Sequence, residues 1–124
     1  MGLDQFARTM NSKPEFPVDF EMPDNEQTEE IMYWRKHPDL QGWMKMLYEE
    51  KGGKDPAFNC NTVQLDLKDL DRLEKDIINK ELPKTSGFFF GESYGDEDAQ
   101  DLEFVQKARA AIRQGKTVYY SSWW

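Results

Sequence analysis

The sequence predicts a small α+β domain, in which a mixed or antiparallel sheet of four to five strands carries about three helices on one face. Most of the segments that are typical of strands are followed by a segment with helical spacing of apolar residues. The connections are too few and too short for a doubly wound parallel sheet. A chain of 124 residues fits one core, because two half-length domains would each bury too little apolar surface. We therefore expect residues 1–124 to form a single domain.

The composition favours a folded core built largely from aromatic rings. Hydrophobic residues make up 38% of the chain and aromatic residues 14%, with eight Phe, five Tyr and four Trp. An enclosed aromatic side chain buries roughly 150–250 Å², so these rings compensate for the small number of aliphatic residues. A disordered chain of similar charge would lack them.

The first half of the chain predicts two strands separated by an arm, and then a helix. Residues 3–9 are expected to form a short strand, followed at 11–28 by a loop or arm rich in prolines and acidic residues. Residues 29–36 carry β-branched and aromatic residues that favour a second strand. Pro38 suits the first turn of a helix, and the glycine pair at 52–53 is expected to end it.

The middle of the chain predicts a further strand and helix. Residues 60–65 are expected to form the strand, and Asp66 is placed to cap a helix over residues 67–80. Leucine and isoleucine residues with helical spacing line one face of that helix. Pro83 is expected to close the segment.

The last third of the chain predicts strand, helix and strand. Residues 87–91 form a short apolar run between glycines, which favours a strand, and the acidic run at 95–101 is expected to open a third helix. Gly115 is expected to end that helix, and residues 116–124 to form the last strand. The buried stripe of the helix is predicted to consist of Leu102, Val105, Ala108 and Ile112.

The net charge of −8, from 24 acidic and 16 basic residues, disfavours direct nucleic-acid binding, which needs clustered Lys and Arg. Residues 1–30 hold eight acidic residues against two basic ones, and residues 81–103 hold seven against one. Such segments are either ordinary solvated faces or an acidic surface for a basic partner.

No motif in the sequence predicts catalysis, a cofactor or a metal site. A zinc site needs several closely spaced Cys or His residues, and the chain has one of each, Cys60 and His37, with nothing to orient them as a nucleophile and base. The acidic residues from Asp96 to Asp101 lack the ligand pattern of an EF-hand and are better explained as a helix start. We expect no catalytic residues, no metal and no cofactor.

The compartment expected from the sequence is a cytoplasm. No stretch approaches the ~20 apolar residues that a membrane-spanning helix requires, so no membrane association is expected. The single cysteine allows no intrachain disulfide, and the first ten residues contain no apolar run typical of a secretion signal.

The strongest candidate for a binding site is a basic and aromatic segment where a strand meets a helix. Loop ends of this kind often carry binding residues, and Arg and Trp are frequent interface hot spots. Strand alternation would place Tyr33 and Arg35 on one face and Trp34 and Lys36 on the other, so a purely structural role remains open. The candidate residues are Tyr33, Trp34, Arg35, Lys36, His37 and Trp43.

The two C-terminal tryptophans pose a similar choice. Trp123 is expected to close the core at the end of the last strand. Trp124 is harder to enclose at that position, so its ring is expected to be exposed or to contact a partner.

Several short motifs resemble those of a family of small tailed-bacteriophage proteins. They are the start at residues 1–4, the Tyr-Trp-Arg-Lys run at 33–36, the Ser-Gly-Phe-Phe-Phe-Gly run at 86–91 and the ending at 119–123. At residues 5–7 the chain departs from the family's Met-Tyr-Leu type of strand. The resemblance implies a phage origin and a place in the host cytoplasm. It implies no activity and no catalytic residues.

Three functional hypotheses follow. The leading one is a phage-encoded accessory protein that binds a host or phage protein without catalysis. The alternative is a small-molecule or nucleotide-binding protein, or an enzyme, that uses Arg35, Lys36 and His37 as an anion site beside Trp34 or Trp43. The third is a homo-oligomer built through the edge of the C-terminal strand and Trp124.

Overall fold

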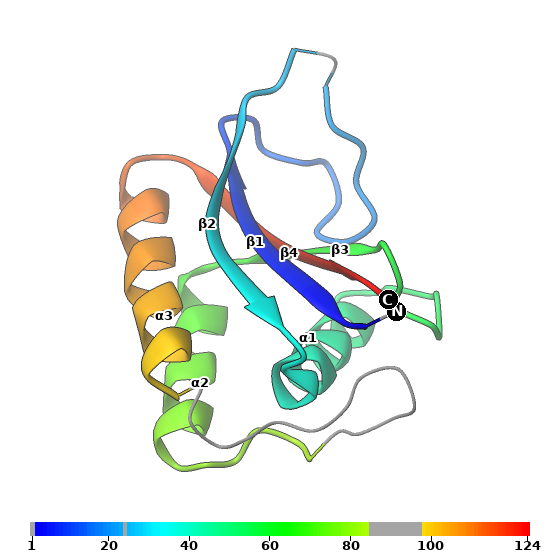
Figure 1. Ribbon diagram of the computed structural model, residues 1–124. Coiled ribbons are helices and arrows are strands. Elements are labelled where there is room, and N and C mark those ends of the chain that lie inside the picture. Colours follow the sequence, from blue (N-terminus) through cyan, green and yellow to red (C-terminus); the bar gives the residue numbers. More distant parts are fainter. Residues whose placement is uncertain (1, 24, 85–97) are drawn as a thin grey trace.

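The structure is a computed structural model that describes residues 2–23, 25–84 and 98–124. These residues form a four-stranded antiparallel sheet in the order β2-β1-β4-β3 together with three helices, which confirms the predicted α+β class (Figure 1). The strands are β1 (Asp4–Met10), β2 (Thr28–Arg35), β3 (Thr62–Leu65) and β4 (Thr117–Trp123). The helices are α1 (Pro38–Glu50), α2 (Leu67–Ile78) and α3 (Asp98–Arg113).

One face of the sheet packs with all three helices in a single hydrophobic core. Alternate residues of the strands point into this core, because successive side chains of a strand lie on opposite faces. Core side chains of the sheet include Ala7, Trp34, Val63 and Tyr120. The predicted placement of the helices on one face is therefore confirmed for the described residues.

The C-terminal strand β4 lies inside the sheet, where it pairs with β1 along one side and with β3 along the other. From Val118 to Ser121 its backbone is therefore paired on both sides. This arrangement contradicts the prediction of a homo-oligomer built through the edge of the last strand. The sheet's edges are β2 and β3.

Local signals place the helix boundaries as predicted. Pro38 stands in the first turn of α1, and Gly52, with a φ of +102°, follows its last turn. The side chain of Asp66 accepts a hydrogen bond from the backbone N–H of Asp69, whose own side chain accepts from the N–H of Asp66, which closes a capping box at the start of α2. Gly115, with a φ of +88°, follows α3.

The buried stripe of α3 differs from the predicted one. Val105 and Ala108 are fully buried as expected, but Leu102 and Ile112 are only half-buried. Phe104 and Ala111 replace them, because the helix turns the face that also contains Asp101 towards the sheet. The strand predicted at residues 87–91 lies outside the described residues.

The predicted arm is docked along the edge of β3. Val18 forms a bridge with Val63, and the backbone N–H of Asp19 donates to the carbonyl of Thr62 at 3.0 Å. The carboxylate of Asp19 accepts hydrogen bonds from the hydroxyl of Tyr48 and from the side-chain amide of Asn61. The arm therefore satisfies part of an edge that would otherwise expose unpaired backbone groups.

Candidate functional site

The residues at the end of β2 divide between the surface and the core. Tyr33 and Arg35 are exposed and Trp34 is 2% exposed, which is the alternation predicted from the sequence. Lys36 was expected on the same face as Trp34, but it is exposed. The strand ends at Arg35, and Lys36 adopts a left-handed φ of +57° that breaks the alternation.

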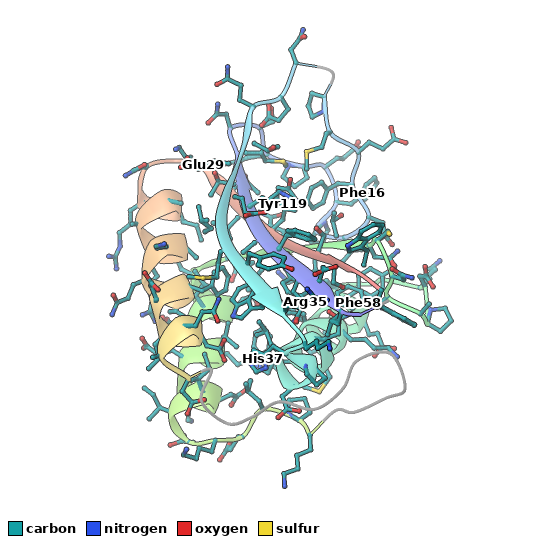
Figure 2. The ribbon with its side chains drawn as sticks, in the orientation of Figure 1. Phe16, Glu29, Arg35, His37, Phe58 and Tyr119 are labelled. Atoms are coloured by element: carbon teal, nitrogen blue, oxygen red, sulfur yellow. The ribbon has the colours of Figure 1, made fainter. Side chains whose placement is uncertain are left out.

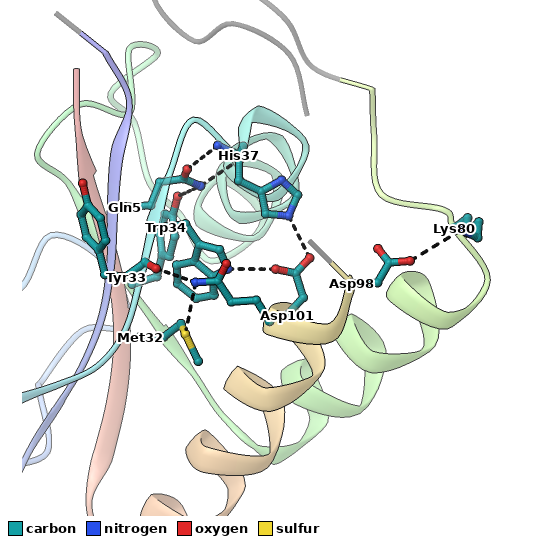
Figure 3. A network of polar contacts seen from close by, with 10 residues as sticks. Gln5, Met32, Tyr33, Trp34, His37, Lys80, Asp98 and Asp101 are labelled. Carbon is teal, nitrogen blue, oxygen red and sulfur yellow. Dashed lines mark hydrogen bonds and ion pairs between the residues drawn. The ribbon is translucent and has the colours of Figure 1, made fainter. Parts of the chain in front are cut away.

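His37 and Trp34 converge on a buried carboxylate. The indole Nε1 of Trp34 donates to Asp101 Oδ1 at 2.9 Å, and His37 Nε2 lies 2.8 Å from Asp101 Oδ2 (Figure 3). Asp101 is 0% exposed and His37 is 3% exposed. Asp101 thus joins the start of α3 to the connection between β2 and α1.

A glutamine of β1 holds the backbone of His37 from the other side. Gln5 accepts from the N–H of His37 and donates to its carbonyl, both at 2.9 Å (Figure 3). It also donates to the hydroxyl of Tyr120, which in turn donates to Gln41. Burial raises the pKa of Tyr120 well above its usual range, so this phenol stays protonated and can serve as the donor.

This hydrogen-bond network connects β1, β2, β4 and α3 inside the core. Its members are Gln5, Trp34, His37, Asp101 and Tyr120. An imidazole oriented by a carboxylate also occurs in catalytic sites, but here a substrate would have to enter the core to reach either group. From the sequence, Asp101 belongs to an acidic run that is typical of a helix start. Its spacing of three, four and seven residues from buried positions of α3 was the signal that it faces inward.

Trp43 and Trp124 are also tied into the structure. Trp43 is 1% exposed and its Nε1 donates to Asp76 at 2.8 Å. Trp124 is half-buried, and its backbone N–H and carbonyl both bond to the side chain of Asn59. The alternative anion site required an accessible tryptophan ring beside Arg35. Trp34 and Trp43 are both buried and cannot provide it.

The opposite face of the sheet exposes aromatic rings instead. We call the group formed by Phe6, Tyr33 and Trp123 the aromatic face. Trp123 is 59% exposed and Tyr33 is 40% exposed, and the rings of Phe6 and Tyr33 lie 5.4 Å apart. The hydroxyl of Tyr33 and the indole Nε1 of Trp123 both donate to the carboxylate of Asp4. The prediction that Trp123 closes the core is thus wrong, because alternation along β4 turns it outward.

Two arginines flank these rings. The guanidinium of Arg8 lies 4.4 Å from the centre of the Phe6 ring, and its Nη1 donates to Ser121 Oγ at 3.2 Å. Arg35 is exposed at the end of β2, near the start of α1 and His37 (Figure 2). Arginine and exposed aromatic rings are the residue types that most often dominate interface energies.

A cleft of about 300 Å³ opens beside Arg8 on this face, between the sheet and the arm. Met22 of the arm lines it, and so do Tyr119 and Trp123 of β4. Phe20 of the arm packs against Tyr119. The centres of the two rings lie 5.4 Å apart and their planes are nearly perpendicular. Burial raises the pKa of the Tyr119 hydroxyl, so this wall of the cleft remains uncharged at neutral pH. We call this feature the Arg8 cleft.

The described residues show neither a metal cluster nor a membrane span. Within residues 2–23, 25–84 and 98–124, no group of three or more His, Cys, Asp or Glu side chains is placed to hold a metal ion. In the same part of the chain, no helix has the length and apolar character needed to cross a membrane.

Comparison with known proteins gives no identification. No protein-family model, curated protein or solved structure matches the chain.

Proposed function

We propose that this chain is a phage-encoded accessory protein that binds a host or phage protein through the aromatic face, without catalysis. The single observation that carries the proposal is the exposure of Trp123 and Tyr33 beside Arg8 and Arg35. Large rings cost free energy when they face water, since roughly 25 cal/mol is gained for each Å² of apolar surface that is buried. Exposed rings gathered on one face are therefore typical of interaction surfaces.

A protein partner fits this face better than a nucleic acid. Stacked bases would suit the rings, but the phosphates that accompany them would meet Asp4 between Tyr33 and Trp123. The net charge of −8 opposes such a ligand over the whole molecule. The phage origin rests on the motif resemblance alone.

The proposal is tested by retention of a partner from host lysate on immobilised wild-type protein and on the variants Trp123→Ala and Arg35→Glu. A retained protein is identified by mass spectrometry, purified and titrated against each variant. Loss of a hot-spot ring weakens binding by about 30-fold or more, so we expect at least that change for Trp123→Ala. We expect Arg35→Glu to weaken binding in the same direction.

The matched control is Ile78→Ala on α2. Ile78 is 62% exposed, close to the 59% of Trp123, but it belongs to a helix remote from the aromatic face in the fold. We expect its affinity to stay within twofold of the wild type. An empty wild-type eluate, or equal retention by all variants, would count against the proposal.

A further inference from the structure

The arginine of the Arg8 cleft differs in its electrostatic environment from the other half-buried arginine. Arg109 is similarly enclosed, and its guanidinium contacts the carboxylates of both Asp71 and Glu74. Arg8 has no carboxylate within ion-pair distance among the residues that the structure describes, although acidic residues outnumber basic ones in the chain. Within the described residues its guanidinium contacts neutral groups instead, the hydroxyls of Ser121 and Tyr119 and the ring of Phe6.

The contacts of Arg8 hold the guanidinium in place without using all of its donors. The group carries five N–H donors in a planar fork, and the hydroxyls of Ser121 and Tyr119 take up only some of them. Packing over Phe6 at 4.4 Å restrains the rest of the group. A restrained guanidinium loses little entropy when it binds a carboxylate through two parallel hydrogen bonds.

A second polar group in the same cleft also lacks a partner. Thr62 lines the Arg8 cleft from β3, and its hydroxyl oxygen is buried without a hydrogen bond. An unmade hydrogen bond at a buried hydroxyl is costly. A peptide group that displaces the side chains covering this oxygen would supply the missing partner. Thr62 is paired with Ser121 in the sheet register, and the hydroxyl of Ser121 bonds to Arg8.

Most of the remaining lining is apolar or aromatic. Met22, Tyr119 and Trp123 surround the polar end of the cleft, and its volume of about 300 Å³ is at the lower limit for a small-molecule site. The cleft therefore suits one or two side chains of a larger partner, which obtains its other contacts from the exposed rings of the aromatic face.

We infer that the Arg8 cleft receives an extended peptide segment in which an acidic residue adjoins an apolar side chain. The carboxylate bonds to Arg8, and the apolar side chain packs against Met22 and Trp123. This inference rests on the proposed function, since it names the chemistry of the partner at the same face. An isolated carboxylate is favoured over a phosphate chain because repeated anions would also meet Asp4 and the register neighbour of Arg8, Glu30.

The experiment selects a random library of twelve-residue peptides on the immobilised full chain. An enriched peptide is then synthesised and titrated by fluorescence anisotropy. We expect enrichment of Asp or Glu next to an apolar residue, and at least about tenfold weaker binding to Arg8→Gln, because a charge-assisted hydrogen bond is lost. Arg113→Gln makes the same charge change on α3 and should leave affinity within twofold.

A further variant shifts affinity in the opposite direction. Glu30 lies opposite Arg8 in the register of β1 and β2 and competes electrostatically with a bound carboxylate. Glu30→Gln should therefore strengthen binding of the acidic peptide by a few fold, which a nonspecific loss of folding cannot produce. The melting temperature of each variant confirms that the chain remains folded.

The outcomes separate this inference from the proposed function. No enrichment, enrichment without acidic residues, or equal binding by wild type and Arg8→Gln would overturn the inference. Displacement of the peptide by single-stranded oligothymidylate, with loss on Arg8→Gln, would overturn it in favour of a nucleic acid. A lysate partner can also be lost on Trp123→Ala and retained by Arg8→Gln. In that case the proposed function stands, because the aromatic face binds a protein, and the inference fails, because Arg8 binds no carboxylate of that protein.

Discussion

Replacement of the buried carboxylate of Asp101 by an amide should strongly destabilise the protein. Asp101 is 0% exposed and accepts from Trp34 Nε1 at 2.9 Å while it pairs with His37 Nε2 at 2.8 Å. Asp101→Asn keeps the size of the side chain but has only one oxygen. Its NH₂ group would replace one of the two carboxylate oxygens. Either the indole N–H of Trp34 then loses its acceptor, or the imidazole of His37 has to accept from the amide at Nε2.

The magnitude follows from this loss. A buried donor without a partner costs about 1–3 kcal/mol, and a hydrogen bond to a carboxylate contributes more than one between neutral groups. We therefore expect Asp101→Asn to lower the unfolding free energy by about 2–3 kcal/mol. Since a typical domain unfolds with about 5–15 kcal/mol, Asp101→Asn should lose a large part of the stability.

The free energy of unfolding is measured by urea denaturation of the wild type, Asp101→Asn and Asp98→Asn. Asp98 is on the same helix, but its side chain is 43% exposed and lies 3.6 Å from Lys80, so its substitution should cost less than about 1 kcal/mol. A change below 1 kcal/mol for Asp101→Asn would refute the view that this carboxylate ties α3 to the sheet. Trp34→Phe in the Asp101→Asn background should cost less than in the wild type, because one donor no longer needs an acceptor.

Two further predictions concern the ion pair between α2 and α3 and the packing around Tyr48. Hydrogen bonds from Arg109 hold the pKa of Glu74 below its ordinary value of 4.5, so the folded state gains stability above that pH and loses it as the pH falls through the lowered pKa. The difference in urea midpoint between wild type and Glu74→Gln should therefore be present at pH 7 and vanish in strong acid, and a difference that is independent of pH would contradict the assignment. A Cβ at Gly53 would lie 2.3 Å from the ring of Tyr48, whose hydroxyl bonds to Asp19 of the arm. Gly53→Ala should cost about 1–3 kcal/mol in the unfolding free energy and speed proteolysis within residues 11–27, whereas Lys54→Ala should leave both unchanged.

Much of the fold was predictable because it depends on local signals. Pro38, Asp66 and Gly115 mark helix ends through their own backbone chemistry, and these marks act over a few residues. The order of the strands was not predictable in the same way. The insertion of β4 between β1 and β3 depends on pairing across more than 100 residues, of which the sequence gives no local sign.

The candidate site was predictable only in part for a related reason. Alternation along β2 correctly separated Tyr33 from Trp34, but the sequence did not show which face would meet the helices. Trp123 was expected in the core because a last strand often closes it, but its position in the register turns it outward. Asp101 was assigned to the surface because carboxylates are common in the first turn of a helix. In both cases the general tendency was overridden by the register of the residue in the tertiary structure.

The two faces of the sheet allow binding and stability to be changed separately. Gln5 and Phe6 are neighbours on β1, but Gln5 is fully buried in the network around His37 while Phe6 supports Arg8 on the aromatic face. A substitution at Gln5 should therefore lower the unfolding free energy and leave the affinity of the folded protein unchanged. A substitution at an exposed ring such as Trp123 should do the reverse. If stability and affinity changed together at both positions, the aromatic face would be part of the core and not a surface for a partner.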